Sequence, residues 1–582
     1  MEQLAAIDIN LGSFVGVHNA LGLRPLLRYT NQKQYQELVP LVAKGQILAA
    51  FAFTAPEAGS NPWAISTRAV QVAPGQYLLS GEKKWIGTAA WAGIITLFAH
   101  VTDLKGRSLG ITAFILQPPM TGFRQGQEEL TMGLRGMVQN TLILDKVLVT
   151  DQDVLGQMGQ GMVIAQDMMK YARLMVAAAA LGAMKRSLQL MYRYAHRRLI
   201  STGPLLSNWK TRDAFGLHLT QVQALEGLVT AIGKWIDQHL DVPDEFFAAV
   251  KVIGPECAGA CIDRTLQTLG GRGYTENNPL PQMLRDVRLL RIFEGPSETM
   301  QMFLGQRIYD DSPTLFTFLE NIAKDMATQL RLAVKHLKER LIQTHGHLPS
   351  ALALQRVYFE LATLGQWSLW SIALTSLPKK SPALQWTEKN FNDQLETLRR
   401  LDFTHNQMAH PFYSEEEIEE KIRSYQESIG DLEFRASGTL TEMDPYLRRE
   451  WSPGHHHTPK RYHAPQNISH DSPVQLWLTQ WMGKKFALSP SQLAQLTQFD
   501  QDRPLSDFGM DSISAVELAQ DLSDHFSIDV TPTLVWDYPN LRAMTHYLQG
   551  LLHRPQNLDQ VTLDQATDEE MAKMLAQELT TK

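Results

Sequence analysis

Cysteine is nearly absent from this chain: Cys257 and Cys261 are its two cysteines among 582 residues. Two cysteines exclude a disulfide framework, which favours a reducing compartment, so we expect a cytoplasmic protein. They stand four residues apart in GPECAGACIDRTLQTL, which has a helical pattern. We therefore interpret them as two small buried side chains on one face of a helix.

Long apolar runs and an excess of basic charge are also missing. No stretch reaches the length that spans a membrane, and the first residues, MEQLAAIDIN, carry neither the basic nor the apolar region of a secretory signal. The formal net charge of −7 argues against nucleic acid as the main partner. Hydrophobic residues make up 44% and charged residues 20%, which is typical of a soluble globular protein, and the length predicts several domains.

The pattern along the chain predicts a multidomain α+β protein. Apolar residues recur every three or four positions in the helical parts, whereas the β-rich part has short runs such as IITLFAHV and GITAFIL, broken by glycine, proline and asparagine. The predicted segments are N-terminal helices (1–48), a β domain (49–155), a helical bundle (156–310), a helical extension without a readable motif (311–451), a linker (452–472), a compact helical domain (473–552) and a tail with a short amphipathic helix (553–582).

The linker is rich in proline, histidine and serine and has no periodicity, which is typical of a flexible connection. Its run of His455, His456 and His457 offers metal ligands in principle. We favour the plain linker because no cysteine or carboxylate stands at ligand spacing, and we expect no metal in the protein.

The segment SDFGMDSISAVEL, residues 506–518, places Ser512 at the start of a predicted amphipathic helix, with Ile513, Val516 and Leu518 facing inward. Taken alone, a serine at a helix start predicts only a cap. The surroundings favour more, because TPTLVWDYPNL follows at 531–541 and an apolar helix precedes. The large apolar residues of that preceding segment are Leu476, Trp477, Trp481 and Phe486.

This pattern resembles the acyl and peptidyl carrier proteins of polyketide and nonribosomal assembly lines. The resemblance implies a four-helix carrier domain over 473–552, with 4′-phosphopantetheine attached to the Ser512 hydroxyl by a phosphopantetheinyl transferase. A phosphodiester anion is favoured where the free N–H groups and the positive end of a helix meet. Nine acidic and four basic residues give this segment a balance of −5, and carriers of this kind dock on basic surfaces.

Four ordered segments occur in residues 1–310: FAFTAPEAGSN (51–61), GEKKWIG (81–87), LQTLGGRGYTENNP (266–279) and IFEGPSET (292–299). In order and spacing they resemble the acyl-CoA dehydrogenase family. The resemblance implies a helical domain, a β-barrel domain and a four-helix bundle that bind FAD, and a homo-oligomer. It also implies an electron acceptor, either an electron-transfer flavoprotein or oxygen.

Dehydrogenation of a thioester removes a proton from the α-carbon and a hydride from the β-carbon, so the protein must supply a base and hold both carbons in line. By resemblance, Glu294 is the base, and an apolar setting should raise its pKa. The family's alternative base position is Ala172 here, just before Arg173, so Glu294 has no competitor. The resemblance also implies that the Glu294 N–H and a flavin ribityl hydroxyl polarise the thioester carbonyl.

Other contacts carry over residue by residue from the same resemblance. Thr54, Trp85 and the backbone of Phe51, Phe53, Ile86 and Gly87 would contact the flavin ring. Ser60 would contact both flavin and substrate, and Arg173 would lie on the substrate side. Arg198 would bind the pyrophosphate, and Gln267, Gly270 and Gly271 would reach the FAD of a neighbouring subunit.

Several positions depart from the family pattern. Ala55 stands where the family often has Glu, Gly87 where it has Thr or Ser, and Pro296 where it has Thr. The family also has several helices before the equivalent of Met1 that form part of the acyl pocket, so 1–48 resembles a remnant of that domain. A truncated gene, a split gene or helices supplied from elsewhere would each account for this.

The leading hypothesis is FAD-dependent desaturation of an acyl thioester held on the fused carrier, for a polyketide, nonribosomal or lipid assembly pathway. An upstream acyl-activating enzyme and a downstream synthase would then be partners. Two alternatives remain open: a non-catalytic scaffold that docks a carrier, and a dehydrogenase of free acyl-CoA with a passive carrier. Retention of Glu294 speaks against the scaffold.

Overall fold

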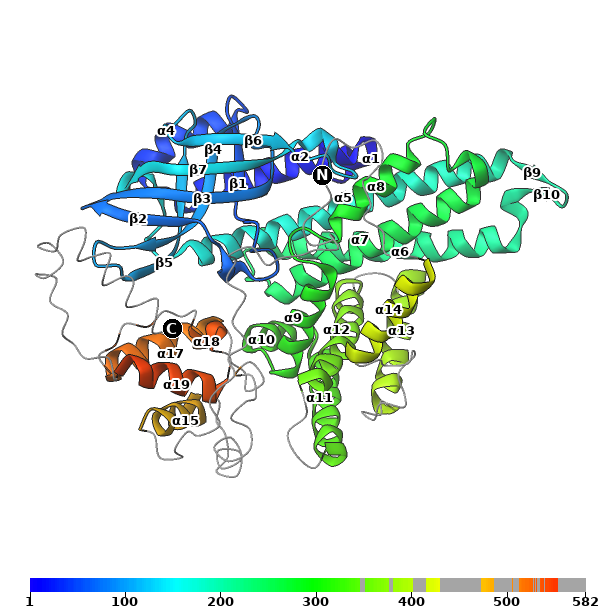
Figure 1. Ribbon diagram of the computed structural model, residues 1–582. Helices are drawn as coiled ribbons and strands as arrows, with labels where there is room; N and C mark the ends of the chain where they lie inside the picture. The colour runs from blue at the N-terminus through cyan, green and yellow to red at the C-terminus, as the bar shows by residue number, and fades with distance from the viewer. Residues whose placement is uncertain are drawn as a thin grey trace, which may run out of the picture. The chain divides into compact units, whose positions relative to one another are not determined.

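The computed structural model describes residues 1–345, 351–375, 380–400, 415–429, 473–485, 505, 512–526, 528, 530, 534–538 and 540–552 (Figure 1). The chain divides into two compact units, residues 1–451 and 452–582, which are described separately below. The predicted linker with its three histidines and the predicted tail lie outside the described residues, as does Phe486. Within the described part, no helix has both the length and the apolar character to cross a membrane.

The first unit begins with short helices. They are α1 (Glu2–Ile7), α2 (Ile9–Val17), the π-helical turn η1 (His18–Leu23), α3 (Arg24–Tyr29) and α4 (Gln32–Ala43). Asp8 caps α2 by accepting from the Asn10 N–H at 2.7 Å, and Asn31 and Gln34 form a capping box at the start of α4. The apolar faces of η1, α3 and α4 pack with β1, β4 and β5 in one buried cluster.

An eight-stranded mixed sheet follows, in the pairing order β6-β7-β3-β2-β4-β5-β8, with β1 added parallel to β4. The strands are β1 (Leu48–Ala52), β2 (Arg68–Ala73), β3 (Gln76–Gly87), β4 (Ala92–Thr102), β5 (Ser108–Leu116), β6 (Phe123–Glu128), β7 (Gln139–Thr150) and β8 (Val154–Leu155). The run IITLFAHV forms the centre of β4 and is buried on both faces, which explains why its apolar residues do not alternate with polar ones.

Long helices form the bundle: α5 (Gly161–Arg197), α6 (Trp209–Asp237), α7 (Asp244–Leu269), α8 (Leu280–Leu290) and α9 (Ser297–Tyr309). The hairpin of β9 (Leu199–Ile200) and β10 (Gly203–Pro204) joins α5 to α6. Helices α5 and α7 pack closely because Gly254 faces Ala177, and the Ser187 hydroxyl bonds to that of Thr265 at 2.8 Å. Both cysteines lie on α7, where Cys261 is buried and Cys257 half-buried, and burial raises both thiol pKa values to about 12.

The helical extension consists of α10 (Pro313–Ile322), α11 (Lys324–His345), α12 (Ala351–Ala373), α13 (Pro382–Arg400) and α14 (Glu415–Ile429). Helix α12 packs along α9, where Gly305 leaves room for the backbone at Tyr358. Trp367, Trp370 and Trp386 form an aromatic cluster with ring centroids 5.0 to 5.5 Å apart. The extension therefore has an apolar core that is continuous with the bundle.

The second unit contains α15 (Pro473–Lys485), α17 (Ser512–Phe526), α18 (Leu534–Asp537) and α19 (Leu541–Leu552) in its described part. Val474, Leu478, Leu518, Leu522 and Leu548 are buried together, so Leu518 faces inward as expected. Ser512 is the first residue of α17, which confirms the predicted helix start, and its side chain lies outside what the structure describes.

Candidate active site

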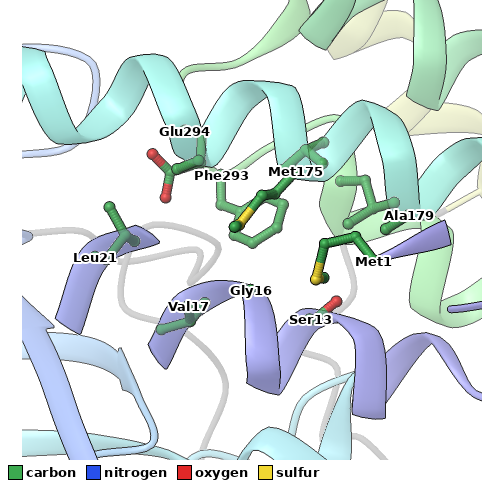
Figure 2. Close-up of a pocket in the computed structure, with 12 residues that line it drawn as sticks. Met1, Ser13, Gly16, Val17, Leu21, Met175, Ala179, Phe293 and Glu294 are labelled. Atoms are coloured by element: carbon green, nitrogen blue, oxygen red, sulfur yellow. The ribbon is translucent and has the colours of Figure 1, made fainter. Parts of the chain in front are cut away.

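A narrow cleft runs between α2 and α5 and is bounded by the segment that joins α8 to α9 (Figure 2). The cleft is open to solvent at its mouth. Figure 2 shows Glu294 and Leu21 toward one end, and Met1, Ser13 and Ala179 toward the other. The lining is almost entirely apolar and consists of Met1, Ser13, Gly16, Val17, Leu21, Ala172, Met175, Val176, Ala179, Leu290, Phe293 and Glu294. Such a surface suits a hydrocarbon chain, with one carboxyl group at its end.

Main-chain contacts hold Glu294 in an uncommon conformation. Its φ of 57° is left-handed, which is strained for a residue with a side chain, and Gly295 follows with φ of 94°. The Arg173 Nε donates to the Glu294 carbonyl at 3.1 Å. The Lys251 Nζ donates to the carbonyl of Arg291 at 3.1 Å and to that of Gly295. The half-buried Arg173 and the buried Lys251 thus fix the main chain on both sides of Glu294.

The surroundings of Glu294 raise the pKa of its carboxyl group, as expected from the apolar segment. Burial is the largest cause, and the positive charges of Arg173 and Lys251 lower the pKa and partly offset it. The side chain keeps some exposed surface because it faces the cleft, but protein atoms surround it on the remaining sides. Its backbone N–H makes no hydrogen bond to any described residue and is available to an oxygen atom in the cleft.

Lys251 is a site residue that the sequence reasoning missed. Its side chain is fully buried in α7, and burial lowers the pKa of its amine to about 8 against the opposing effect of Glu294. A signal was present, because Lys251 interrupts the apolar run FFAAVKVIG, and a lysine inside such a run needs a buried acceptor.

A second buried lysine ties the β3 strand to the loop after β1. The Lys83 Nζ donates to the Phe53 carbonyl at 2.8 Å, and the Lys84 N–H donates to the Thr54 carbonyl at 3.0 Å. Burial, followed by the charge of Arg68, holds the pKa of Lys83 well below its usual value. Among the described residues, Lys83 and Lys251 are the lysines with fully buried side chains, and each holds one segment that carries predicted site residues.

The residues predicted to contact the flavin ring gather along these two segments. The β3–β7 register shifts between Lys83 and Ile86, so Trp85 bulges out with φ of 56° and its side chain is 48% exposed. Phe51 and Phe53 pack on Phe98 and share an apolar cluster with the cleft-lining residues Leu21 and Ala172. Ile86 is buried, Thr54 is half-buried and Ser60 is exposed.

The departure at Gly87 has a structural reason. A Cβ atom there would lie 3.1 Å from the Cε of Met137, so a threonine or serine would require Met137 to move. The residues present nevertheless fit a flavin ring. A half-exposed indole stands on a strand bulge, and the loop that carries the Thr54 hydroxyl is hydrogen-bonded to the same bulge.

The remaining predicted contacts lie elsewhere on the bundle. Arg198 follows the last residue of α5, and Gln267, Gly270 and Gly271 lie at the end of α7; all four are exposed. The end of α7 faces the C-terminal half of α5 through the Ser187–Thr265 bond, whereas the cleft lies against its N-terminal half. Within the described part of the chain, no atom lies within 4 Å of a Cβ built at Gly270 or Gly271, so this surface is open there.

Comparison with known proteins agrees with this geometry. Residues 50–147 match the acyl-CoA dehydrogenase middle domain, residues 159–309 match the acyl-CoA dehydrogenase C-terminal domain, and residues 491–548 match the phosphopantetheine attachment site. An acyl-CoA dehydrogenase of Bacillus subtilis (strain 168) is 30% identical over 306 residues, which cover 53% of this chain and 80% of that protein. The mitochondrial very long-chain specific acyl-CoA dehydrogenase of Macaca fascicularis is 30% identical over 69% of this chain and 62% of its own length.

Solved structures give the same result. Butyryl-CoA dehydrogenase from Megasphaera elsdenii is 28% identical with a TM-score of 0.51, covering 53% of this chain and 80% of that structure. A glutaryl-CoA dehydrogenase from Mycobacterium smegmatis in complex with FADH2 is 25% identical with a TM-score of 0.50, and the match covers 53% of this chain and 77% of that structure. The cleft, the two segments predicted to contact the flavin and these matches are consistent with one another, and the matches show that the chain belongs to the acyl-CoA dehydrogenase family, as an FAD-dependent member with a C-terminal phosphopantetheine attachment domain.

Proposed function

We propose that this protein dehydrogenates an acyl thioester between its α- and β-carbons, with the acyl group held on the phosphopantetheine arm of its own carrier domain. The observation that carries the proposal is the single carboxylate with a raised pKa at one end of an apolar cleft. When bound, FAD supplies the hydride acceptor for the β-carbon.

Substrate binding, proton removal and polarisation of the thioester carbonyl would fall to different residues of the chain. Val17, Met175 and Val176 bind the acyl chain and exclude water from the reacting carbons. The Glu294 carboxylate takes the α-proton, and burial brings its pKa closer to the pH at which a base must work. The thioester carbonyl gains negative charge as this proton leaves, and the available Glu294 N–H can donate to it. Loss of one proton and one hydride gives the 2,3-enoyl thioester.

The fused carrier is the reason to favour an arm-bound substrate over a free one. A linker of about twenty residues would keep the arm of Ser512 at an effective concentration of millimolar order near the cleft. The acyl-activating enzyme that loads the arm and the synthase that takes the product are proposed partners, and an electron-transfer flavoprotein or oxygen would reoxidise the enzyme.

The test is anaerobic flavin bleaching with the full chain. The carrier is loaded from octanoyl-CoA by a phosphopantetheinyl transferase. A separate sample of flavin-loaded protein without the phosphopantetheine arm receives free octanoyl-CoA. Faster bleaching in the loaded sample, with loss of two hydrogens in the intact mass of the carrier, supports the proposal. Faster bleaching by free octanoyl-CoA would assign the substrate to the free thioester. A yellow protein that bleaches in neither sample would favour the scaffold alternative.

A further inference from the structure

The cleft has a direction, which follows from the helices that line it. Along α2 and η1 the lining passes from Ser13 to Leu21, and along α5 it passes the opposite way, from Ala179 to Ala172. Figure 2 shows these two segments side by side, with Glu294 near the Leu21 end. The apolar end therefore receives the acyl chain, and anything attached to the thioester sulfur must leave past Leu21 and Ala172.

Both segments continue beyond that end and meet there. Arg24 begins α3, one helical turn after Leu21, and Tyr171 directly precedes Ala172 on α5. The guanidinium carbon of Arg24 stands 3.3 Å from the centroid of the Tyr171 ring, and this ring packs on Phe247 at 6.1 Å. Stacking on a supported ring fixes the plane of the guanidinium group, so little freedom is left to lose when it binds a ligand.

Arg24 has no acidic partner within the part of the chain that the structure describes. Among the described residues, its Nε is buried without a hydrogen-bond partner, and its guanidinium group stacks on Tyr171. The nearby carboxylate of Asp167 is already occupied, because it accepts from the Tyr29 hydroxyl at 3.0 Å and pairs with the Nε of Arg28 at 3.3 Å. Lys170 is paired as well, with Asp244 at 2.7 Å. A positioned arginine fork without an anion is suited to a phosphate group.

We propose that Arg24, stacked on Tyr171, is a binding subsite for the phosphate at the far end of the pantetheine arm. The proposal rests on the proposed function, because it takes the cleft to hold an acyl thioester. The same phosphate chemistry is present in a carrier-bound arm and in coenzyme A, so the site would select for phosphopantetheine over shorter thioesters. Nothing in the family resemblance required an arginine at this position, and Arg24 was not among the predicted site residues.

The experiment compares two thioesters that differ only in the phosphate group. The full chain without its phosphopantetheine arm is given octanoyl-pantetheine or octanoyl-4′-phosphopantetheine in the absence of an electron acceptor, and the dissociation constants of both are measured by calorimetry. Arg24→Met keeps an unbranched apolar side chain over Tyr171 but removes the charge. We expect it to weaken binding of the phosphorylated compound about tenfold, the order expected for a charge-assisted hydrogen bond, and to leave the other compound unchanged.

Two further variants make the result specific. Arg28→Met removes a cation one turn further along α3 that is already paired with Asp167, and it should leave the preference for phosphate intact. Arg24→Lys keeps the charge without the planar fork and should retain part of the preference. Equal affinity of the wild type for the two thioesters would overturn the proposal. So would a loss of affinity in Arg24→Met that is the same for both thioesters, or a loss of the phosphate preference in Arg28→Met as large as that in Arg24→Met.

Two additional experiments distinguish coenzyme A from the carrier-bound arm as the source of the phosphate. Octanoyl-CoA is titrated into the apo protein, and the carrier loaded with octanoyl-phosphopantetheine is followed in a single turnover. If Arg24→Met weakens binding of octanoyl-CoA or slows the single turnover of the loaded carrier, that experiment identifies the source of the phosphate. If Arg24→Met changes neither result, the proposal is contradicted. Binding without turnover would leave the phosphate site standing while the proposed dehydrogenation fails, so the two failures are distinguishable.

Discussion

At the scale of single residues, the site depends on Glu294, whose backbone is strained and is held in place by hydrogen bonds from two cationic side chains. A left-handed φ at a residue other than glycine costs about 1 to 3 kcal/mol. Hydrogen bonds from Arg173 to the Glu294 carbonyl and from Lys251 to the Gly295 carbonyl offset this cost. The same two side chains carry the positive charges that moderate the pKa of the Glu294 carboxyl. The same pair of residues therefore holds the Glu294 segment in position and partly offsets the rise in its carboxyl pKa that burial causes.

Replacing Glu294 by glutamine should abolish the reaction and leave FAD bound. Glutamine keeps the size and polarity of the side chain but cannot accept the α-proton, so the bleaching rate should fall by about 10² to 10⁴. The measurement is stopped-flow flavin absorbance, with flavin content determined beforehand. Glu298→Gln is the control, because Glu298 is exposed in the first turn of α9. Bleaching at the wild-type rate in Glu294→Gln would assign the base to another residue.

Replacing Lys251 by methionine should move the pH profile of the reaction. The base works when deprotonated, so the rate rises as pH passes the raised pKa of Glu294. The charge of Lys251 lowers that pKa, so its removal should shift the acidic limb to higher pH. Because the pKa of Lys251 is itself lowered to about 8, the difference should shrink above that pH. Arg173, Glu256 and Glu298 also act on Lys251 and stay in place.

Lys185→Met serves as the control for this profile, because Lys185 is a cation of α5 that pairs with Glu2 and Glu226 away from Glu294. Lys251→Gln keeps a donor for the carbonyls of Arg291 and Gly295 but no charge, and it should shift the limb as methionine does. If the acidic limb of the pH–rate profile stays at the same pH in both Lys251 variants, Lys251 has only a structural role.

At the scale of elements, the helical extension is bound to the bundle by close packing of α12 on α9. Gly305 permits this approach, because a Cβ there would collide with the Tyr358 carbonyl, and Gly365 of α12 faces Ile308 in the same way. Helix α9 begins three residues after Glu294. The extension therefore packs on the helix that follows the Glu294 segment.

Gly305→Ala should lower the thermal unfolding midpoint of the protein. Overpacking of this kind costs about 1 to 3 kcal/mol, which exceeds the gain of about 0.5 to 1 kcal/mol from alanine in a helix. Gly233→Ala in α6 is the matched control, because no atom lies within 4 Å of its Cβ position, and it should raise the midpoint slightly. Equal midpoints for the two variants would contradict the packing between α9 and α12.

At the scale of the whole molecule, the chain joins a flavoenzyme of known family to a carrier domain. Incubation with coenzyme A and a phosphopantetheinyl transferase should add one arm to the wild type and none to Ser512→Ala. Intact mass spectrometry of the full chain measures both. Ser514→Ala is the control, since Ser514 lies in the same helix and should leave the modification unchanged. An unmodified wild type would remove the carrier function.

The flavin-loaded protein should be oligomeric. Gln267, Gly270 and Gly271 are exposed at the end of α7, where the surface is open, and the cleft lies against the other half of α5. The resemblance assigns them to the FAD of a neighbouring subunit, so an isolated protomer would leave the adenine half of the cofactor poorly held. Analytical ultracentrifugation with detection at a flavin wavelength tests this expectation, and a sedimenting monomer with full flavin content would refute it.

The sequence alone determined the family, the fold class and the cofactors, because these follow from short segments whose order and residue types carry the chemistry. IFEGPSET gave Glu294 as the proposed base, which stays a prediction, and SDFGMDSISAVEL placed Ser512 at a helix start that α17 confirms. The assigned contacts at Trp85, Arg198 and Gln267 stay predictions. Local spacing also predicted that β4 is a strand and that α5 is a long helix.

Only the tertiary structure decided which distant residues act on these segments. Lys251 stands 43 positions before Glu294 in the chain, and Arg24 stands 147 positions before Tyr171, so no local pattern links either pair. The direction of the cleft likewise required α2 and α5 to lie side by side. Burial supplies the physical reason. A lysine or arginine removed from water must find main-chain carbonyls, an aromatic face or an anion, and only the packed fold determines which of these is within reach.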